Sequence, residues 1–397
     1  MSTIKVTNIE HASTGDGGIQ LDNAGHVTVD GQQMPTTGPL SNRNLIINGA
    51  MQVSQRSTSV TGVANNSDEG YQTLDRFGMY FGNSAGGVCT VSQATDVPSN
   101  QGFSNSIKID VTTADTSVAS NHEIYVSQKI ESQTVRDSGW NYTSASSYVT
   151  LSFWAKSSKA GTYCVSARAD DVGAKYYPFE YTLTANTWTK VTHSIPGDSA
   201  LVFNNDSGSG LNVRWILVAG SSRQGGTNGA WGATSTSNMA TPNQVNFFDN
   251  TSNDFLLTGV QLEVGEKATP FEHRSFGDEL AKCQRYFQHF GRDGVGGGRL
   301  IGTGNGASTS LFGFEFPYIM RAAPTLNYYG ANVDGGTFQV HCPGESSTDN
   351  TAPTYADPGV KSIRWNFTGQ SGGATKPHFM DMGTGTNQFG FTADAEL

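Results

Sequence analysis

The feature that most constrains this chain is an alternation of apolar and polar side chains with a period of two. In residues 147–156, Val149, Leu151, Phe153 and Ala155 occupy alternate positions. Successive side chains of a β-strand point to opposite faces, so this pattern predicts a strand with one buried face. Further candidate strands are residues 161–168, 187–193, 212–218 and 254–263.

The composition also favours short strands joined by tight turns. The chain has 397 residues, of which 48 are Gly and only 15% are charged, against about a quarter in ordinary soluble domains. Aromatic residues reach 10%, which argues against disorder. Many short strands with turn residues between them are typical of a jelly roll, so we predict a mainly β fold with a jelly-roll β-sandwich over residues 41–275. Residues 220–253, which include Phe247 and Phe248, are predicted to form long surface loops.

Residues 1–40 have a different character, because short polar strands alternate there with turn signals such as Asp16-Gly17 and Asp30-Gly31. The segment holds too few apolar residues for a core of its own, and a small isolated β element is only marginally stable. We therefore predict that residues 1–40 attach the chain to a particle or intertwine with identical chains.

Residues 276–397 begin with a convincing helix pattern. Ser275 is a candidate N-cap, and Asp278 follows it in a position similar to that of a capping box. The apolar stripe predicted for this helix consists of Leu280, Cys283, Phe287 and Phe290. Period-two patterns return in residues 311–316, 361–367 and 388–392. We predict a C-terminal β-rich knob domain preceded by this helix, with the three Phe of residues 312–316 facing a core.

Charge, hydropathy and the N-terminus exclude several classes of protein. The formal net charge is −10 at pH 7, and Lys and Arg form no cluster of the kind that binds nucleic acid. No apolar run reaches the length of about 18 residues that a membrane-spanning helix needs, and the N-terminus lacks a signal-peptide core. We predict a protein made in a cytoplasm that stays there or leaves by lysis. Free buried thiols are predicted for Cys89, Cys164, Cys283 and Cys342.

Candidate catalytic carboxylates are few. An enzyme that cleaves glycans needs two carboxylates at one sugar linkage. The candidates are Asp170-Asp171, Asp249 with Asp254, and Glu263 with Glu272. Adjacent Asp residues mostly form turns, and the G-x-S-x-G elbow of serine hydrolases is absent from the sequence. The glycine runs at 294–298 and 302–306 lack the helix that follows a dinucleotide-binding loop. We therefore predict no catalytic residue and no enzymatic activity.

Metal-binding motifs are equally scarce. The sequence contains neither C-x-x-C nor H-E-x-x-H, and His341 and Cys342 would point to opposite faces of a strand. A Ca²⁺ site built from loop oxygens of Asp206, Asp249 and Asp254 stays open, because a hard cation needs only oxygen ligands. We predict no cofactor and no metal-ligating residue.

Binding through aromatic side chains is the remaining prediction. An aromatic face stacks on the apolar side of a sugar ring, and the polar edge of Tyr or Trp makes hydrogen bonds. Loop positions suggest contacts with a glycan or another chain for Trp231, Trp140, Tyr142, Tyr328 and Tyr329, and for Trp231 both uses stay open. In contrast, core positions in strands are expected for Trp154, Trp188, Trp215 and Trp365.

Several segments resemble a family of phage tail-fibre and virion-appendage proteins. The first is Asn42-Arg-Asn-Leu-Ile-Ile-Asn-Gly-Ala-Met-Gln-Val53, followed by Gln55-Arg56, Asp75-Arg76-Phe77 and Phe153-Trp-Ala-Lys156. The strongest is Gly259-Val-Gln-Leu-Glu-Val-Gly-Glu-Lys-Ala-Thr-Pro-Phe-Glu-His-Arg274, which runs into Glu279-Leu-Ala-Lys-Cys-Gln-Arg-Tyr-Phe287. Weaker matches are Phe316-Pro-Tyr-Ile-Met-Arg-Ala-Ala-Pro324 and Thr392-Ala-Asp-Ala-Glu-Leu397. These landmarks cover most of the chain.

The resemblance implies a jelly roll similar to carbohydrate-binding modules, a homotrimer and a place on the virion. The implied function is that of a tail fibre that adsorbs to a host-surface glycan, with other tail or capsid proteins bound through residues 1–40. A capsid decoration or head fibre is the alternative, and a glycan depolymerase tailspike is less favoured. The matching motifs have structural patterns and carry no binding residue. For Asp75-Arg76 we expect a buried ion pair or a surface pair rather than a ligand contact.

Overall fold

The computed structural model describes the chain in segments separated by gaps. The described residues are 8–9, 18–21, 27–29, 32–33, 42–65, 70–291, 298–304, 309–330, 338–341, 348–350, 353–368, 377–382 and 389–397. The chain divides into two compact units, Met1–Glu279 and Leu280–Leu397, and each is described by itself. The predicted three-part division at residues 40 and 275 stays a prediction.

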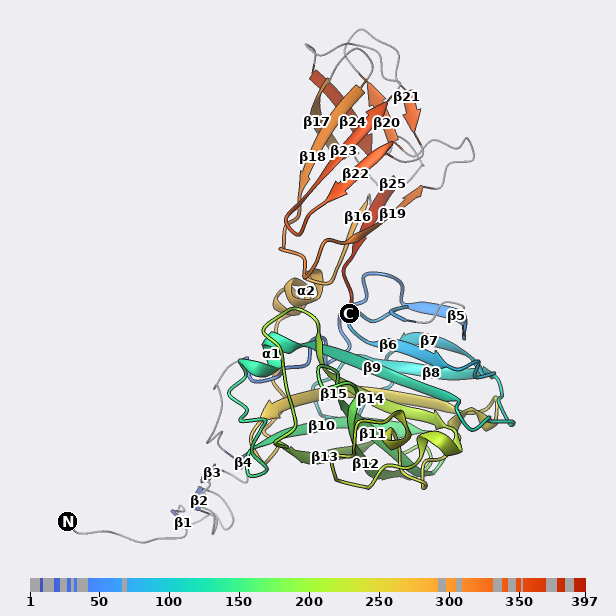
Figure 1. Cartoon of the computed structure of the whole chain (residues 1–397), viewed down its shortest axis with the longest axis vertical. Coiled ribbons are helices and arrows are strands. Elements are labelled where there is room, and N and C mark those ends of the chain that lie inside the picture. The colour runs from blue at the N-terminus through green and yellow to red at the C-terminus, as the bar shows by residue number, and fades with distance from the viewer. Residues whose placement is uncertain are drawn as a thin grey trace, which may run out of the picture. The chain divides into compact units, whose positions relative to one another are not determined.

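Unit 1 is built around two antiparallel sheets that lie face to face (Figure 1). Sheet I has the order β13-β10-β15-β8-β7-β5 and sheet II the order β12-β11-β14-β9-β6. Sheet I consists of β5 (Ser59–Ala64), β7 (Val88–Ala94), β8 (Ser106–Thr113), β10 (Tyr148–Ser157), β13 (Thr189–Pro196) and β15 (Asp254–Val264). Sheet II consists of β6 (Gly78–Gly82), β9 (Glu123–Glu131), β11 (Gly161–Ala169), β12 (Lys175–Leu183) and β14 (Ser209–Ala219). Because the chain crosses repeatedly from one sheet to the other, the predicted jelly-roll sandwich is confirmed.

The period-two pattern explains how β10 fits into sheet I. Val149, Leu151, Phe153 and Ala155 are each at most 1% exposed and belong to the core between the sheets. The strand pairs antiparallel with both β13 and β15, and Phe153 lies opposite Val191. The strands predicted at 161–168, 187–193, 212–218 and 254–263 correspond to β11, β13, β14 and β15.

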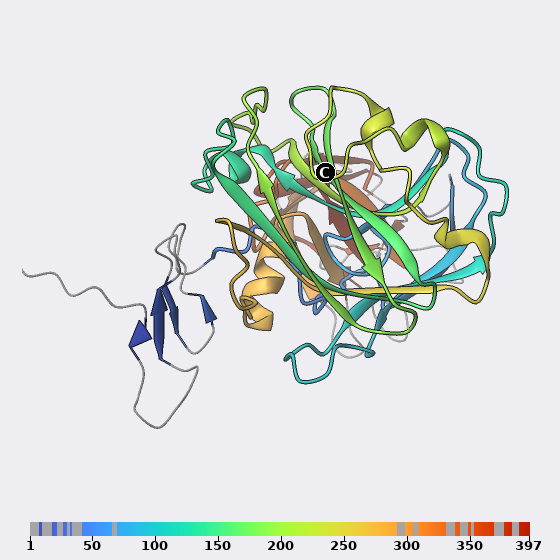
Figure 2. The same cartoon turned by 90° about the horizontal axis from the view of Figure 1, so that it is seen from below.

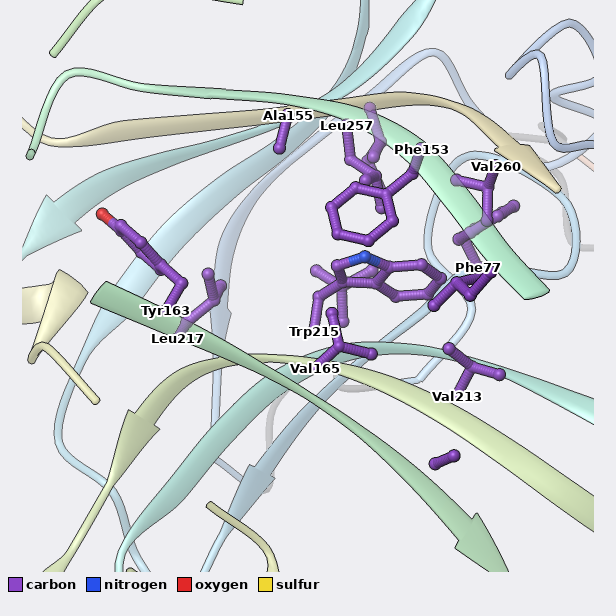
Figure 3. Close-up of a cluster of buried hydrophobic side chains, with 14 of the residues drawn as sticks. Phe77, Phe153, Ala155, Tyr163, Val165, Val213, Trp215, Leu217, Leu257 and Val260 are labelled. Atoms are coloured by element: carbon purple, nitrogen blue, oxygen red, sulfur yellow. The ribbon is translucent and has the colours of Figure 1, made fainter. Parts of the chain in front are cut away.

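Trp215 of β14 lies at the centre of this core (Figure 3). Its side chain is fully buried, and the ring of Phe153 stands edge-on to it, with centroids 5.8 Å apart and planes at 90°. Phe77 packs beside it at 6.1 Å. Such an aromatic pair contributes about 0.5–1.5 kcal/mol beyond the burial of its surface. The prediction of a core position for Trp215 is therefore confirmed.

The segment between β14 and β15 departs from the prediction of long surface loops. It contains the short 3₁₀ turns η1 (Ser221–Arg223), η2 (Thr236–Asn238) and η3 (Phe247–Asp249). Phe247 and Phe248 are 0% exposed, and Phe248 packs edge-on against Phe81 of β6, with centroids 5.9 Å apart. The prediction is wrong for these two residues, because the polar segment carries two aromatic side chains back into the core.

Shorter elements complete unit 1. The helix α1 (Ser132–Arg136) follows β9 directly. Near the N-terminus, antiparallel strands pair in the order β1-β2-β3-β4 (dark blue in Figure 2). They are β1 (Asn8–Ile9), β2 (Ile19–Leu21), β3 (Val27–Val29) and β4 (Gln32–Gln33). The attachment role of residues 1–40 stays a prediction.

Unit 2 contains two further antiparallel sheets in its described part. Sheet III has the order β16-β25-β19, and sheet IV the order β21-β20-β24-β17-β18-β23-β22. Sheet III consists of β16 (Phe287–Gly291), β19 (Thr325–Gly330) and β25 (Phe389–Asp394). Sheet IV consists of β17 (Gly298–Gly304), β18 (Thr309–Glu315), β20 (Phe338–His341), β21 (Thr348–Asn350), β22 (Tyr355–Pro358), β23 (Ser362–Thr368) and β24 (Pro377–Met382).

The core of unit 2 surrounds Trp365, which is 0% exposed, as predicted for a strand Trp. Phe312 and Phe316 are 1% and 8% exposed, and the partly buried Phe314 packs against the same cluster. The prediction that these three Phe face a core is therefore confirmed. Residues two apart point to the same face of a strand, so their spacing places the three rings together on the side of β18 and its partner β23 that faces the core.

The predicted helix is present as α2 (Phe276–Gln284), and its cap is confirmed. The hydroxyl oxygen of Ser275 accepts a hydrogen bond from the backbone N–H of Asp278 at 3.2 Å and donates to its carboxylate at 2.6 Å. The predicted apolar stripe is wrong beyond Cys283, because Phe287 and Phe290 belong to β16. Pairing of β16 with β25 prevails there over the helical spacing.

Three cysteines are free and buried as predicted, namely Cys89, Cys164 and Cys283, whereas Cys342 lies outside the described residues. Burial, together with the nearby Asp110, raises the pKa of the Cys89 thiol to about 12, so that it stays protonated and unreactive. Among the helices of the described segments, none is long and apolar enough to cross a membrane.

Candidate functional site

Residues 42–53 and 259–279, two segments that contain the quoted motifs, meet in unit 1. The Glu272 carboxylate accepts hydrogen bonds from the backbone N–H groups of Arg43 and Asn44 at 3.3 and 3.0 Å. Arg274 donates to the Asn44 carbonyl at 2.5 Å and lies 2.9 Å from the Glu272 carboxylate. The clasp, as we name this set, consists of Arg43, Asn44, Asn48, Glu263, Thr269, Glu272, Arg274 and Glu279.

Buried charge in the clasp is balanced by its own donors. Glu263 is 2% exposed and accepts hydrogen bonds from the backbone and hydroxyl of Thr269 at 2.8 and 2.6 Å. It also accepts from the Gln261 side chain at 2.8 Å and lies 3.5 Å from the Arg43 guanidinium. A buried carboxylate is tolerated when donors satisfy its oxygens in this way. These contacts support a structural role for the matching motifs.

The Asp75-Arg76 pair is buried, with both residues 0% exposed. Asp75 accepts a hydrogen bond from the Gln55 backbone at 3.0 Å and lies 3.8 Å from Arg56. Arg76 donates to the Lys129 carbonyl at 2.6 Å. Burial raises the pKa of the Asp75 carboxyl, although its hydrogen bonds with Gln55 and the charge of Arg56 oppose this. Other groups of the chain therefore bind both side chains, which agrees with the expectation of a buried pair rather than a ligand contact.

Of the aromatic residues predicted to bind, Trp140 and Tyr142 lie together after α1. Trp140 is only 3% exposed, and its indole N–H donates to the Ser147 carbonyl at 3.1 Å. Tyr142 is half-buried and packs edge-on against Phe203, with centroids 5.0 Å apart. The prediction of surface contact is wrong for Trp140, because its loop folds the indole ring into the core of the sandwich.

The other three aromatic residues predicted to bind lie apart from Trp140 and Tyr142. Trp231 is half-buried, its indole N–H donates to the Pro196 carbonyl at 2.7 Å, and its ring lies 5.3 Å from that of Tyr177. Tyr328 is in β19 rather than a loop, and its hydroxyl accepts a hydrogen bond from Trp365 at 3.0 Å. Tyr329 belongs to the same strand, and its side chain lies outside the described part.

Two tryptophans predicted for cores lie instead on the outer side of sheet I. Trp154 takes the outward position of β10, and Trp188 immediately precedes β13, and both are partly exposed. The Trp188 indole N–H donates to the Asp96 carboxylate at 2.9 Å. Lys156 forms an ion pair with Asp96 and lies 5.6 Å from the Trp188 ring centroid. The core prediction is therefore wrong for both, and the charges beside Trp188 balance one another.

The candidate catalytic carboxylates are engaged by the chain itself. Their partners are Arg168 at 3.0 Å for Asp170, Asn204 at 2.9 Å for Asp171, Lys159 at 2.5 Å for Asp249, and Lys108 at 3.4 Å for Asp254. Asp206 accepts from the Gly208 backbone at 2.9 Å and closes a turn. Within the described segments, no group of three His, Cys, Asp or Glu is placed to hold a metal ion. The glycine runs at 294–298 and 302–306 lie partly outside those segments.

Sequence reasoning missed a set of side chains on the outer face of sheet II. On β14, Val213 and Trp215 point into the core, so that the residues alternating with them, Asn212 and Arg214, point outward. The alternation of these polar residues with apolar ones was the available signal. The strip, as we name the outward set, consists of Tyr80, Tyr125, Lys129, Arg168, Tyr176 and Arg214.

Strand register places Arg214 in the middle of the strip. It lies opposite Ser127 on β9 and Ser166 on β11. These small neighbours leave room for the guanidinium, which lies 4.5 Å from the ring centroid of Tyr125 and 5.6 Å from that of Tyr176. The adjacent row across the strands consists of Lys129, Asn212, Arg168 and Tyr176. Aromatic rings and cations therefore alternate across sheet II.

One end of the strip is open to solvent. Tyr80 is 39% exposed, and its ring stacks on that of Tyr125 with centroids 4.8 Å apart and planes at 28°. Beyond Tyr80, Met239 packs with Tyr125 and Tyr176 in a separate buried cluster, so these two rings are 5% and 2% exposed. Burial raises the pKa of the Tyr125 hydroxyl, which therefore remains a hydrogen-bond donor at neutral pH. The exposed ring of Tyr80 therefore contacts Tyr125, which in turn lies against the buried guanidinium of Arg214.

Arg214 lacks a charged partner. It is 4% exposed, and no carboxylate oxygen lies within 4.0 Å of its guanidinium in the described part of the chain. The oxygens that it meets are neutral: the Tyr176 hydroxyl at 3.5 Å and, with the amide oriented to accept, that of Asn212 at 3.1 and 3.2 Å. Beside it, the buried Ser166 hydroxyl has no hydrogen-bond partner among the described groups. An uncompensated charge is costly to bury, so this arrangement is suited to receive an acceptor.

Unit 2 carries a shallow depression of about 740 Å³ over β17, β18 and β23. Its charged lining residues are Glu315 and Arg364, and its rim includes Ile301, which is 69% exposed. Because one carboxylate accompanies one guanidinium, this surface lacks the excess of positive charge that distinguishes the strip.

No family model matches this sequence, and a search of curated proteins found no match either. Among solved structures, the enzymatically active domain of tailspike protein 4 from bacteriophage CBA120 is 14% identical with a TM-score of 0.30, over 56% of this chain and 22% of that one. The xylan-binding CBM22-1 domain from Paenibacillus barcinonensis is 10% identical with a TM-score of 0.27, over 59% and 100%. At these scores the likeness carries no argument about the site. The assignment of a mainly β protein built on a jelly-roll sandwich rests on the sheet topology of this chain itself.

Proposed function

We propose that unit 1 binds a glycan through the strip, and that the chain is a non-enzymatic tail-fibre protein that adsorbs a phage to its host. The observation that carries the glycan proposal is the stack of the exposed Tyr80 on Tyr125, next to the buried guanidinium of Arg214. Sugar recognition needs this combination, because a pyranose has an apolar face to stack and hydroxyls to hydrogen-bond.

Strand geometry supports the proposal, because the strip is built on a sheet rather than on loops. The strip residues project from five adjacent strands of sheet II, whose other face is fixed by the core around Trp215. Groups held on rigid strands lose little conformational entropy on binding. A glycan reaches the exposed ring of Tyr80 first, and the ring of Tyr125 and the guanidinium of Arg214 follow directly behind it.

The virion role is supported by the motifs that resemble phage tail-fibre and appendage proteins. In this proposal the chain forms a homotrimer, and residues 1–40 connect it to other tail proteins. Three strips on one fibre, and several fibres on one particle, multiply a weak contact into strong adsorption, because later binding events become intramolecular. A non-catalytic role agrees with the candidate carboxylates, which are all occupied by internal partners.

Replacing Tyr80 tests the glycan site directly. We expect Tyr80→Ala to weaken glycan binding about tenfold, because a lost stacking contact of about 1.4 kcal/mol changes Kd by that factor. The matched control is Tyr318→Ala in unit 2, since Tyr318 is 41% exposed and Tyr80 is 39% exposed. Binding to a glycan array, followed by titration calorimetry, measures both variants. Equal binding by the wild type and Tyr80→Ala would contradict the site.

Three further measurements test the rest of the proposal. Sedimentation equilibrium of the full chain is expected to give a trimer, and a monomer would contradict the assembly. Immunogold labelling is expected at the tail of intact particles, whereas label on the capsid would favour the decoration role. Chromatography of glycans after incubation is expected to show unchanged chain lengths, and shortened products would identify a depolymerase.

A further inference from the structure

We propose that the strip selects acidic glycans, in which a carboxylate or sulfate on the sugar pairs with Arg214. This inference rests on the proposed glycan function and adds the chemical class of the ligand. The first observation is the uncompensated guanidinium itself. At 4% exposure it meets only neutral oxygens, from Asn212 and Tyr176, and no carboxylate within 4.0 Å in the described residues. A bound anion would supply the missing charge.

The second observation is the orientation of Arg214. Tyr125 and Tyr176 hold the guanidinium at 4.5 and 5.6 Å from their ring centroids, which limits its rotation. A fixed planar guanidinium matches the two oxygens of a carboxylate or sulfate, and such charge-assisted pairs are stronger than neutral hydrogen bonds. The pairing is therefore prepared before the ligand arrives.

The third observation is the surrounding charge. Lys129 and Arg168 lie opposite Asn212 in the row next to Arg214. Asp170 balances Arg168 at 3.0 Å. Burial lowers the pKa of the Lys129 ammonium, and repulsion from Arg214 contributes in the same direction while Asp170 opposes it. The strand register therefore places three cations, Lys129, Arg168 and Arg214, in two neighbouring rows of sheet II, where a bound anion would pair with them.

The local charge is opposite to that of the chain as a whole. The formal net charge is −10, from 34 acidic and 24 basic residues, so that an acidic polymer is repelled by most of the protein. A strip of cations within such a surface directs an anionic ligand to one place. A neutral glycan would gain hydrogen bonds here but no pairing of opposite charges, which is why the arrangement indicates acidic glycans.

The experiment compares matched ligands on the full chain. Polygalacturonate is paired with its methyl-esterified form, and dextran sulfate with dextran, so that each pair differs in charge and shares a backbone. Affinity electrophoresis gives Kd for each at two salt concentrations. We expect the charged member of at least one pair to bind about tenfold or more tightly, in line with charge-assisted contacts, and to weaken as salt increases. An effect in the polygalacturonate pair indicates a site for carboxylates, and an effect in the dextran pair indicates a site for sulfates.

Variants locate the effect in the strip. Arg214→Met is expected to abolish the preference for the charged ligand, whereas Lys129→Gln and Arg214→Lys are each expected to reduce it. Lys190→Gln is the control, because Lys190 is an exposed lysine on β13 of sheet I and lies outside the strip. If Arg214→Met fails to fold, Lys129→Gln decides.

The outcomes separate the two proposals. Equal binding of charged and neutral ligands, with loss in Tyr80→Ala, would overturn the acidic class and keep the glycan site. Equal loss in Lys190→Gln and Lys129→Gln would reveal unspecific ion exchange and overturn the acidic class too. Failure to bind any member of a broad glycan array would overturn the proposed function and this inference together.

Discussion

The clasp and the strip both bury polar side chains in unit 1, but they balance charge differently. In the clasp, Glu263 has hydrogen-bond donors from its own segment and a guanidinium at 3.5 Å. In the strip, Arg214 is equally buried and meets neutral oxygens and aromatic rings. Balanced buried charge stabilises a fold, whereas unbalanced buried charge lowers stability and is retained where it serves another purpose. The comparison therefore contrasts a structural site, the clasp, with the proposed binding site, the strip.

The largest expected effect is on the clasp. Glu263→Ala is expected to lower the free energy of unfolding by about 3–5 kcal/mol, because the Arg43 guanidinium and the Thr269 backbone N–H lose their buried partner. Denaturant titration of the full chain measures this. Glu266→Ala is the control, since Glu266 is exposed and nearby in sequence. A loss below about 1 kcal/mol would contradict the structural role of the clasp.

A smaller effect is expected from Glu272, and it depends on pH. Burial raises the pKa of this carboxyl, but the Asn44 backbone N–H and the Arg274 charge outweigh it, so that the pKa lies below its ordinary value of 4.5. A lowered pKa in the folded state stabilises the protein fully above the unfolded value, and this contribution is lost as pH falls through the folded value.

Glu272→Gln is therefore expected to cost about 1–2 kcal/mol at pH 7, because its amide replaces a charged acceptor. The difference from the wild type should shrink as pH falls from 4.5, where the unfolded carboxyl takes up protons, through the lower folded-state value, where the contribution is lost. Unfolding curves at stepwise lower pH measure it. A difference that grows in acid would contradict the sign of the pKa shift.

The smallest effect on stability is expected in the strip, where binding should change instead. Arg214→Met is expected to alter the free energy of unfolding by less than about 1 kcal/mol, because removing an uncompensated charge offsets the lost contact with Tyr125. The same titration measures it beside Glu263→Ala. A loss as large as that of Glu263→Ala would show that Arg214 is structural and would remove the contrast between the two regions.

Local patterns were sufficient to predict the fold class. The alternation around Phe153 identified β10, because the period of a strand is visible within a few residues. The polar composition of residues 220–253 led to a wrong prediction of surface loops. Two aromatic side chains in that segment, Phe247 and Phe248, are buried in the core. Phe290 also fits a helical stripe, yet it pairs in β16, because contacts distant in sequence decide between helix and strand.

The candidate site was harder to predict than the fold, for a physical reason. Tyr80 and Arg214 come together on the two sides of Tyr125 only through the pairing of β6, β9 and β14, and their separation in sequence hides this. The loop positions used to choose Trp140 and Tyr328 do not report exposure, since one ring lies in a core and the other belongs to a strand. The alternation of Asn212 and Arg214 with apolar residues of β14 is visible in the sequence. The residues that lie beside them on the sheet could not be known without the strand order.

The clasp also has a consequence for chain connectivity. Asn44 is hydrogen-bonded to Glu272, so the polypeptide of the sandwich returns to its starting point and forms a nearly closed ring. The chain can therefore be given new termini by circular permutation. A permutant that joins residue 279 to residue 42 through a short linker, and that begins at the exposed Gln101, should form both sheets of the sandwich. The order in which strands follow one another is then less fundamental to this sandwich than the contacts that close it.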